Sequence, residues 1–382
     1  MMERYIDGPN PDATVKKVCF VIFGVAFSGA ENVLIQYLKN NVEIDAYFLI
    51  IFAGEALSHF KQYFDDSKIF LLNIKYSKNE LRFLPAITQR RLCKAALPVI
   101  REIKPDVLYI NNTLEIALSK ALIKTSGIPA IGHVHDMKKS IGTPAKRYEI
   151  QMAFKYLKRI VAVSEACKRS WNNPKIQVVY NGLPDDFWID RLDNIPRRKN
   201  EKYLTIGFVG MISRIKGIDI LADAIARTQC NIRWIIVYNS YEKSFEKYIH
   251  ILKKKDNVQL YYQLKYQEMK EFYDNIDILV IPSREDSLPT VAIEAMSRGI
   301  IVTGFSVGGI PELLGDSQLI TSGTTADALL ERINFLQKLS NQDLRKIREC
   351  LYGRARNMFS LKTKCNIINQ IIGDSAQEKD EI

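Results

Sequence analysis

Hydrophobic residues in the first half of the chain gather in short runs that are separated by amphipathic segments. The β-branched and aromatic runs predict buried strands at 15–25, 44–52, 69–74, 107–111, 130–135 and 160–164. Between them, segments such as 30–38 and 88–103 repeat their apolar residues at helical spacing and predict helices. Alternation of strands and helices is typical of a parallel sheet with helices on both faces.

A polar, charged break at 196–200 precedes a second series of the same kind. Strands are predicted at 204–209, 232–238, 258–262, 278–282, 300–303 and 318–320, with helices at 217–227, 242–255, 267–274 and 289–298. The length of 382 residues also fits two domains. We therefore predict an α/β protein with two Rossmann-like domains, 1–190 and 200–345, that face each other across a cleft. A C-terminal helix within 346–372 is expected to cross back to the first domain.

Composition narrows the class of protein. Hydrophobic residues make up 47% and charged residues 25% of the chain, as in ordinary globular proteins. The six cysteines are scattered without a CxxC pair, so neither a zinc site nor a disulfide framework is expected. Residues 1–17 are polar, and the longest apolar run, 18–25, is far shorter than the ~20 residues that cross a bilayer. We expect a cytoplasmic protein.

The chain carries a formal net charge of +11, which suits an anionic partner. Basic residues recur in the first domain, in the segment 88–104 and in the pairs Lys146-Arg147, Lys158-Arg159 and Lys168-Arg169. Two interpretations stay open: contact with the inner face of an anionic membrane, or a solvated surface that aids solubility. Pro98 argues against one continuous helix over 88–103. No nucleic-acid-binding module is visible, so nucleic acid is not an expected partner.

The stretch 281–299, IPSREDSLPTVAIEAMSRG, holds the most informative pattern. A strand ends at Pro282, a polar loop follows, Pro289 suits the first turn of a helix and Gly299 its end. Ligands of open α/β sheets lie at the carboxyl ends of strands, where a helix N-terminus attracts phosphate. The Glu294 carboxylate could accept hydrogen bonds from ribose hydroxyls, and Asp286 could face a sugar. The alternative is that these carboxylates only cap the helix.

This stretch resembles the signature of the group 1 glycosyltransferases, the large retaining GT-B superfamily. Their pattern is an acidic residue, seven residues, then Glu, Ala and Met. Asp286 and Glu294 fill the two acidic places, with Asp where Glu is commoner, and Glu285 is the alternative to Asp286 as catalytic carboxylate. The resemblance implies that the start of the helix binds a nucleotide-sugar donor, through Leu288, Pro289 and Thr290.

A second segment, 207–221, resembles the family's phosphate-binding turn. Lys216 and Gly217 match the family's Lys-Gly, whereas Met211 stands where the family has Arg, and Arg214 is close enough to supply that charge. Fixed cations stabilise the negative charge of a departing diphosphate. We therefore expect no metal and no cofactor besides the nucleotide diphosphate sugar, and no Asp-x-Asp triplet occurs. The alternative is that Arg214 and Lys216 are solvated loop residues.

Three further segments resemble parts of the family's cleft. In 27–34, FSGAENVL, the resemblance places Gly29 at the donor. In 131–137, IGHVHDM, His135 is the preferred catalytic match and His133 the reserve, and alternation puts both on one strand face. The loop in 304–314 offers backbone N–H groups to the donor through Gly308 and Gly309, while Glu312 is expected only to cap the helix that follows it.

The resemblance implies a retaining glycosyltransferase that moves a sugar from a nucleotide diphosphate sugar to a glycan or glycolipid acceptor. It also implies a place in cell-surface polysaccharide synthesis. The first domain would hold the acceptor and the second domain the donor. Two rival interpretations are a nucleotide-sugar epimerase on the same fold and a catalytically silent, glycan-binding partner subunit.

Overall fold

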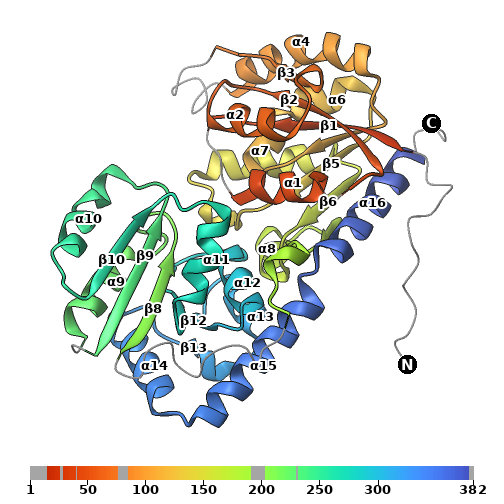
Figure 1. The fold of residues 1–382 in the computed structure, drawn as a ribbon. Coiled ribbons are helices and arrows are strands. Elements are labelled where there is room, and N and C mark those ends of the chain that lie inside the picture. Colours follow the sequence, from red (N-terminus) through yellow and green to blue (C-terminus); the bar gives the residue numbers. More distant parts are fainter. Residues whose placement is uncertain are drawn as a thin grey trace.

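The computed structural model describes residues 15–25, 29–39, 41–75, 85–190, 203–228 and 231–377. The chain forms two lobes, each a parallel sheet with helices on its faces (Figure 1). The sheet of the N-terminal lobe has the strand order β3-β2-β1-β4-β5-β6-β7, and that of the C-terminal lobe β10-β9-β8-β11-β12-β13. The predicted α/β architecture with two Rossmann-like domains is confirmed. The predicted break at 196–200 lies outside the described residues.

The N-terminal lobe is built around β1, whose apolar run is fully buried and pairs in parallel with β2 and β4. Its strands are β1 Lys16–Ile22, β2 Ile44–Ile50, β3 Ile69–Leu71, β4 Val107–Ile110, β5 Ala130–Val134, β6 Arg159–Ala162 and β7 Ile176–Val178. Its helices are α1 Gly29–Lys39, α2 Glu55–Tyr63, α4 Pro85–Ile103, α5 Thr113–Leu118, α6 Lys120–Ser126, α7 Pro144–Phe154 and α8 Glu165–Trp171. Short 3-10 turns are η1 Asp66–Lys68, η2 Lys138–Ser140 and η3 Asp185–Phe187.

The C-terminal lobe repeats this plan around β8 and β11, which are neighbours in its sheet. Its strands are β8 Leu204–Val209, β9 Ile232–Tyr238, β10 Val258–Tyr262, β11 Ile278–Ile281, β12 Ile301–Phe305 and β13 Ile320–Thr321. Its helices are α9 Ile218–Arg227, α10 Glu246–Lys253, α11 Tyr266–Asp274, α12 Thr290–Ser297, α13 Ile310–Leu314, α14 Ala326–Lys338 and α15 Asn341–Met358, with 3-10 turns η5 Lys243–Phe245 and η6 Ser317–Leu319.

Several predicted elements differ from the structure. Helix α4 runs without interruption through Pro98, contrary to the expected break. The strand predicted at 318–320 is wrong for most of its length, because Asp316 accepts a hydrogen bond from the Gln318 amide and starts the 3-10 turn η6. The helix predicted at 242–255 is a 3-10 turn followed by the shorter α10. Strand β7 was not predicted.

The end of the chain joins the two lobes. Helix α15 packs on α12 in the C-terminal lobe, so the segment expected at 346–372 is divided between two helices. The second of them, α16 Leu361–Gln377, packs against α1, β4 and β5 of the N-terminal lobe (blue in Figure 1). Within the described ranges, helices that combine the length and the apolar composition needed to cross a membrane are absent.

Candidate active site

The C-terminal lobe places Lys216 and Asp286 together at the carboxyl ends of β8 and β11. The Lys216 Nζ lies 2.6 Å from Asp286 Oδ2, and the Asp286 side chain is only 9% exposed. The turn that carries Lys216 approaches the β11 loop so closely that a Cβ on Gly217 would lie 1.9 Å from the Pro282 carbonyl oxygen, and its φ is +72°. Glycine is therefore required there, because it alone tolerates both the contact and the positive φ.

The loop that carries Asp286 rests on the glycine pair after β12. A Cβ on Gly308, whose φ is +54°, would lie 1.8 Å from the Asp286 carbonyl oxygen, and the Gly309 amide donates to the same oxygen at 2.9 Å. These contacts fix the backbone of the Asp286 loop. The Gly309 N–H, expected to serve the donor, is engaged in holding this loop.

Glu294 lies inside α12, where it faces α11. The Tyr273 hydroxyl donates to Glu294 Oε2 at 2.7 Å. Burial raises the pKa of the Glu294 carboxyl to about 7, and the hydrogen bond from Tyr273 partly opposes this rise. Pro289 is the N-cap residue of α12 and Thr290 its first residue, so the helix begins one position later than predicted.

The remaining cations predicted or found in this lobe have different surroundings. The Arg214 side chain is exposed to solvent, and its carbonyl oxygen accepts a hydrogen bond from Arg284 at 2.8 Å. Arg284 also makes a two-pronged ion pair with Asp219 on α9, with both N–O distances at 2.7 Å.

Leu288, predicted to contact the donor, has a side chain that is 5% exposed and packs in the core.

The N-terminal lobe contributes the two histidines at the end of β5. The His133 and His135 rings lie 4.1 Å apart between centroids, so they share a face as alternation predicted. The Tyr109 hydroxyl lies 2.9 Å from His133 Nδ1, and the Nε2 atoms of both His133 and His135 are buried without a hydrogen-bond partner among the described residues. Burial, with the nearby Lys364 ammonium, lowers the pKa of His135 to about 3, so its ring is neutral at physiological pH.

The two lobes touch through the same loop that carries Asp286. The Ser140 hydroxyl donates to Glu285 Oε1 at 2.7 Å, and the Ser164 hydroxyl donates to the Ser287 carbonyl oxygen at 2.7 Å. Glu312 accepts the amides of the first two residues of α8 at 2.7 and 2.9 Å. The expectation that Glu312 only caps its own helix is therefore wrong, because its carboxylate reaches the start of a helix in the other lobe.

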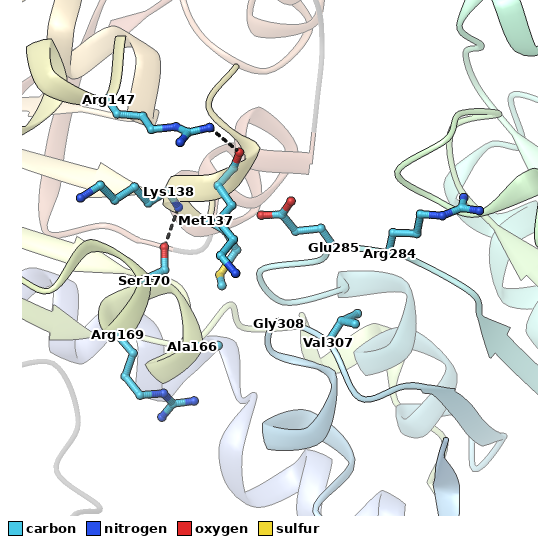
Figure 2. Close-up of a pocket in the computed structure, with 11 residues that line it drawn as sticks. Met137, Lys138, Arg147, Ala166, Arg169, Ser170, Arg284, Glu285, Val307 and Gly308 are labelled. Atoms are coloured by element: carbon cyan, nitrogen blue, oxygen red, sulfur yellow. Dashed lines mark hydrogen bonds between the residues drawn. The ribbon is translucent and has the colours of Figure 1, made fainter. Parts of the chain in front are cut away.

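A cavity of about 660 Å³ lies between the lobes at this point (Figure 2). Arg284, Glu285, Val307 and Gly308 line its C-terminal side, and residues of η2, α7 and α8 line the opposite wall. Gly29 begins α1, and the position of a Cβ on it is open, so the structure shows no steric need for glycine there. Across the residues described, groups of three or more His, Cys, Asp and Glu side chains that could hold a metal ion are not found.

Some polar groups near the cleft were missed by the sequence analysis. Glu115 is fully buried in α5, where Oε1 accepts the Phe23 amide at 2.5 Å while Oε2 has no hydrogen-bond partner in the described part of the chain. Burial raises the pKa of Glu115 well above its ordinary value. Tyr273, Ser140 and Ser164 were missed as well. Each acts on a residue at least 21 positions away, so no local pattern could have identified it.

Two family descriptions match the chain. Residues 190–354 match "Glycosyl transferases group 1", and residues 67–187 match "Glycosyltransferase Family 4". The C-terminal match contains Lys216, Asp286 and Glu294, and the N-terminal match contains His133 and His135. The chain belongs to the group 1 glycosyltransferase superfamily, with the GT-B fold.

Relatives with curated names support this assignment. An uncharacterized glycosyltransferase of Methanocaldococcus jannaschii is 28% identical over 63% of this chain and 67% of its own length. TuaC of Bacillus subtilis, a glycosyltransferase assigned to teichuronic acid biosynthesis, is 26% identical over 64% of this chain and 65% of its own length. The gpi3 subunit of the Schizosaccharomyces pombe phosphatidylinositol N-acetylglucosaminyltransferase is 28% identical over 41% of this chain and 35% of its own length. The chain thus spans between one third and two thirds of these relatives.

Solved structures show the same fold. The Anabaena protein HepE in complex with UDP-glucose has a TM-score of 0.79 over 95% of this chain and 100% of its own, at 18% identity. The lipopolysaccharide outer core galactosyltransferase WaaB has a TM-score of 0.64 over 89% of this chain and 98% of its own, also at 18% identity. At these identities the likeness concerns the fold alone.

Proposed function

We propose that this chain transfers a sugar, with retention of the anomeric configuration, from a nucleotide diphosphate sugar to a hydroxyl of a glycan or lipid-linked acceptor. The observation that carries the proposal is the contact of Lys216 with Asp286 at the carboxyl ends of two central strands. This edge is where open α/β sheets bind ligands. A cation and a carboxylate held there side by side suit a donor that presents a diphosphate next to a sugar.

At the donor end, Lys216 would hold the diphosphate, and the exposed Arg214 could fold over it. Glu294 would accept hydrogen bonds from the ribose, and Gly29, Pro289, Thr290 and Gly308 would border the donor. When the bond between the anomeric carbon and the diphosphate oxygen breaks, the electron pair goes to that oxygen. Lys216 stabilises the charge that develops there, so the proposed reaction needs no metal ion.

At the sugar end, the acceptor hydroxyl would form its bond on the face that the diphosphate leaves. Its proton would pass to the departing phosphate oxygen, which balances the reaction without a protein base. Asp286, with Glu285 as the alternative, would face the sugar and stabilise its positive charge. The neutral His135 would complete a hydrogen bond to a sugar hydroxyl from the opposite lobe through its unpartnered Nε2.

The acceptor and the pathway are inferred from the relatives. TuaC is assigned to teichuronic acid biosynthesis, gpi3 belongs to a phosphatidylinositol N-acetylglucosaminyltransferase, and WaaB acts on the lipopolysaccharide outer core. These names support an acceptor in cell-surface polysaccharide or glycolipid synthesis. Such an acceptor would place the protein in the cytoplasm, at the inner face of the membrane.

Donor binding and turnover test the proposal. UDP-glucose is the first donor to examine because HepE was solved with it, followed by UDP-N-acetylglucosamine and GDP-mannose. A bound donor should raise the thermal midpoint of the wild-type protein by mass action. We expect Lys216→Met and Asp286→Asn each to lower the rate of sugar transfer or donor hydrolysis by about 10²–10³-fold, because each removes a fixed charge from the reaction site.

The matched control is Lys61→Met, which breaks an ion pair of similar length with Asp66 on the surface of the N-terminal lobe. It should leave turnover unchanged. If Lys216→Met binds and turns over donors like the wild type, the donor site is assigned wrongly. If the wild type binds a donor and never cleaves it, the silent-subunit interpretation replaces transfer. The anomeric configuration of the product, measured by NMR, decides whether configuration is retained.

A further inference from the structure

The wall of the cleft cavity that belongs to the N-terminal lobe is rich in positive charge. Lys138 and Lys139 on η2, Arg147 on α7 and Arg169 on α8 all line it. Figure 2 shows Lys138, Arg147 and Arg169 on this side, opposite Glu285 and Arg284. In the figure their side chains spread along the wall and do not meet at one point, which suits an extended ligand better than a single small ion.

The charges of the two walls are compensated differently. On the C-terminal side, Asp219 neutralises Arg284 through the two-pronged ion pair. On the other wall, Arg147 donates only to the carbonyl oxygens of Ile141 and Lys139, which shape the loop but carry no net charge. In the described part of the chain, no carboxylate forms an ion pair with any of the four cations listed in the paragraph above.

This wall lies beside the residues of the proposed reaction. The Ser140 hydroxyl, at the end of η2, donates to Glu285 at 2.7 Å, one residue from Asp286. The Lys138 amide donates to the Ser170 hydroxyl and so ties η2 to α8, which carries Arg169. The cations thus border the cleft on the lobe that would hold the acceptor, while Lys216 serves the donor from the opposite lobe.

We propose that this wall binds a phosphate group of the acceptor, next to the hydroxyl that receives the sugar. This inference rests on the proposed function and specifies its acceptor as a phosphorylated one. Besides Arg284, which is paired with Asp219, four cations and a single carboxylate, Glu285, line the cavity, and this excess of positive charge favours a ligand with two negative charges, such as a phosphate ester, over a singly charged uronate. Arginine and lysine together are well suited to phosphate, because arginine offers a planar fork of donors and lysine a mobile point charge.

The test uses glucose 1-phosphate as the probe, with the full-length protein saturated with UDP so that the donor phosphate site is occupied. The variant is Lys138→Gln/Arg169→Gln, which spares Arg147 because that side chain shapes the loop. The control is Lys124→Gln/Lys155→Gln, which removes the same charge from exposed positions of the same lobe outside the cavity. Calorimetry gives the dissociation constants of UDP, glucose 1-phosphate, glucuronate and methyl glucoside.

We expect the cavity variant to bind glucose 1-phosphate about tenfold more weakly than the wild type, whereas the control changes less than about twofold. UDP binding should be unchanged in both. Unchanged affinity of the cavity variant, an equal loss in the control, or wild-type binding of glucuronate as tight as that of the phosphate would each overturn the proposal. An equal loss of UDP affinity would instead assign the cations to the donor.

Two further measurements distinguish a failure of the phosphate-site proposal from a failure of the proposed glycosyl transfer. Failure of the wild type to bind UDP at all would contradict the proposed function, whatever glucose 1-phosphate does. Sedimentation with phosphatidylcholine vesicles, with and without phosphatidylglycerol, tests a membrane role for the same cations. If the cavity variant loses binding to the anionic vesicles but keeps its affinity for glucose 1-phosphate, the wall serves the lipid surface and the acceptor proposal is wrong.

Discussion

The two sheets present different kinds of polar group at the edges that flank the cleft. In the C-terminal lobe, two cations have carboxylate partners, with Lys216 bound to Asp286 and Arg284 bound to Asp219. In the N-terminal lobe, the buried His135 Nε2 has no hydrogen-bond partner. One lobe therefore holds these two pairs in position before any ligand arrives, whereas the other, among its described residues, has cations without carboxylate partners on its cavity wall and a neutral polar atom that a ligand could satisfy.

This difference matters for catalysis because the two arrangements differ in free energy. Charges that are already fixed stabilise a transition state without reorganising when the reaction occurs. A buried polar atom without a partner destabilises the free protein by about 1–3 kcal/mol, which a ligand that supplies the missing hydrogen bond can recover. In the proposed reaction, the paired charges of the C-terminal lobe would stabilise the departing diphosphate, and the N-terminal lobe would contribute the hydrogen bond from His135 beside the cations of its cavity wall.

The largest expected effect that tests this comparison comes from substituting His133 and His135 one at a time. We expect His135→Asn to lower turnover by about 10²-fold, because it displaces the ring nitrogen that would hydrogen-bond to the sugar. The thermal midpoint should change little. His133→Asn should instead lower the free energy of unfolding by about 1–3 kcal/mol, because the buried Tyr109 hydroxyl loses its partner. Turnover under saturating donor and urea unfolding measure the two effects.

The control for this pair is His250→Asn at an exposed position of helix α10 in the other lobe, for which neither property should change appreciably. A result in which both His133→Asn and His135→Asn affect only stability would mean that these N-terminal histidines do not act on the sugar. The division of work between the lobes would then be wrong, although the donor site would stand.

Features that depend on local sequence could be predicted. Strands β8, β9 and β10 have the predicted bounds, because each is a short run of apolar and aromatic residues between polar turns. The Asp286–Glu294 spacing is local too, since a single loop and helix carry both residues. A strand was predicted where η6 lies because the apolar Leu319 and Ile320 outweighed the hydrogen bond that Asp316 makes to the Gln318 amide.

The contacts between lobes could not be predicted in this way. Glu312 caps α8 from a position 147 residues further along the chain than Glu165, whose amide it accepts. The unpartnered Oε2 of Glu115 likewise depends on how α5 is buried, which a lone Glu in an apolar segment does not reveal. Such features depend on tertiary packing, which brings distant segments together and has no period in the sequence.

Glu294 is an exception within the C-terminal lobe and gives a second, smaller effect. Its folded pKa of about 7 exceeds the ordinary value of 4.5, so the folded protein keeps this proton between those pH values while the unfolded chain releases it. The contribution of the Glu294 proton to the free energy of unfolding is therefore fully present below pH 4.5, is lost as the pH rises to 7, and does not change further above pH 7. Glu294→Gln should remove roughly 1–3 kcal/mol of the stability difference between pH 5 and pH 8.

Urea unfolding of both proteins at the two pH values measures this difference, and subtraction cancels the titration of all other groups that the substitution leaves alone. Glu271→Gln on the exposed side of α11 is the matched control and should behave like the wild type. The opposite outcome is that the free energy of unfolding of the wild type, relative to that of Glu294→Gln, rises between pH 5 and pH 8. It would show that the fold stabilises the Glu294 carboxylate as an anion, like the paired charges of its lobe.

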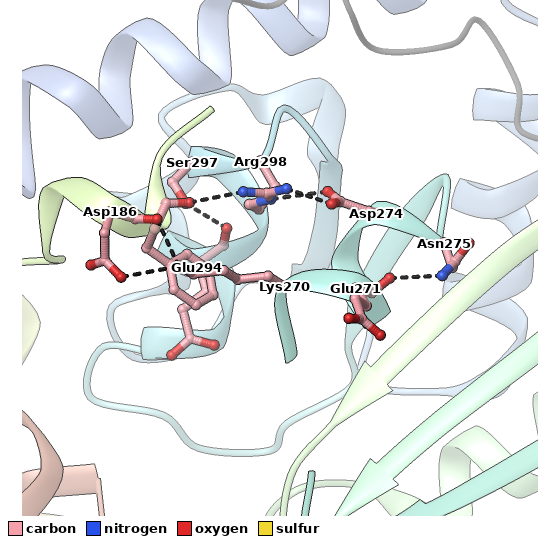
Figure 3. A network of polar contacts seen from close by, with 9 residues as sticks. Asp186, Lys270, Glu271, Asp274, Asn275, Glu294, Ser297 and Arg298 are labelled. Atoms are coloured by element: carbon pink, nitrogen blue, oxygen red, sulfur yellow. Dashed lines mark hydrogen bonds and ion pairs between the residues drawn. The ribbon is translucent and has the colours of Figure 1, made fainter. Parts of the chain in front are cut away.

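The smallest effect concerns the network at the junction of the lobes, where a charge is paired but open to water (Figure 3). Lys270 on α11 donates to the Asp186 carbonyl oxygen at 2.8 Å and to its Oδ2 at 3.0 Å; the Lys270 side chain is 13% exposed, and water reaches the pair through the Asp186 side chain, which is 63% exposed. Lys270→Met keeps the apolar stem and removes the charge. Because solvent screens such a pair, we expect the free energy of unfolding to fall by no more than about 1 kcal/mol.

The control is Lys346→Met, which breaks the i,i+3 pair with Asp343; the two side chains are 66% and 51% exposed. Its loss should be about 0.3–0.5 kcal/mol, as for isolated helix pairs. A loss well above 1 kcal/mol for Lys270→Met would mean that its bond to the Asp186 backbone holds the lobes together. The Lys270–Asp186 contact would then fix the position of the lobes, just as the Lys216–Asp286 contact fixes the proposed donor site.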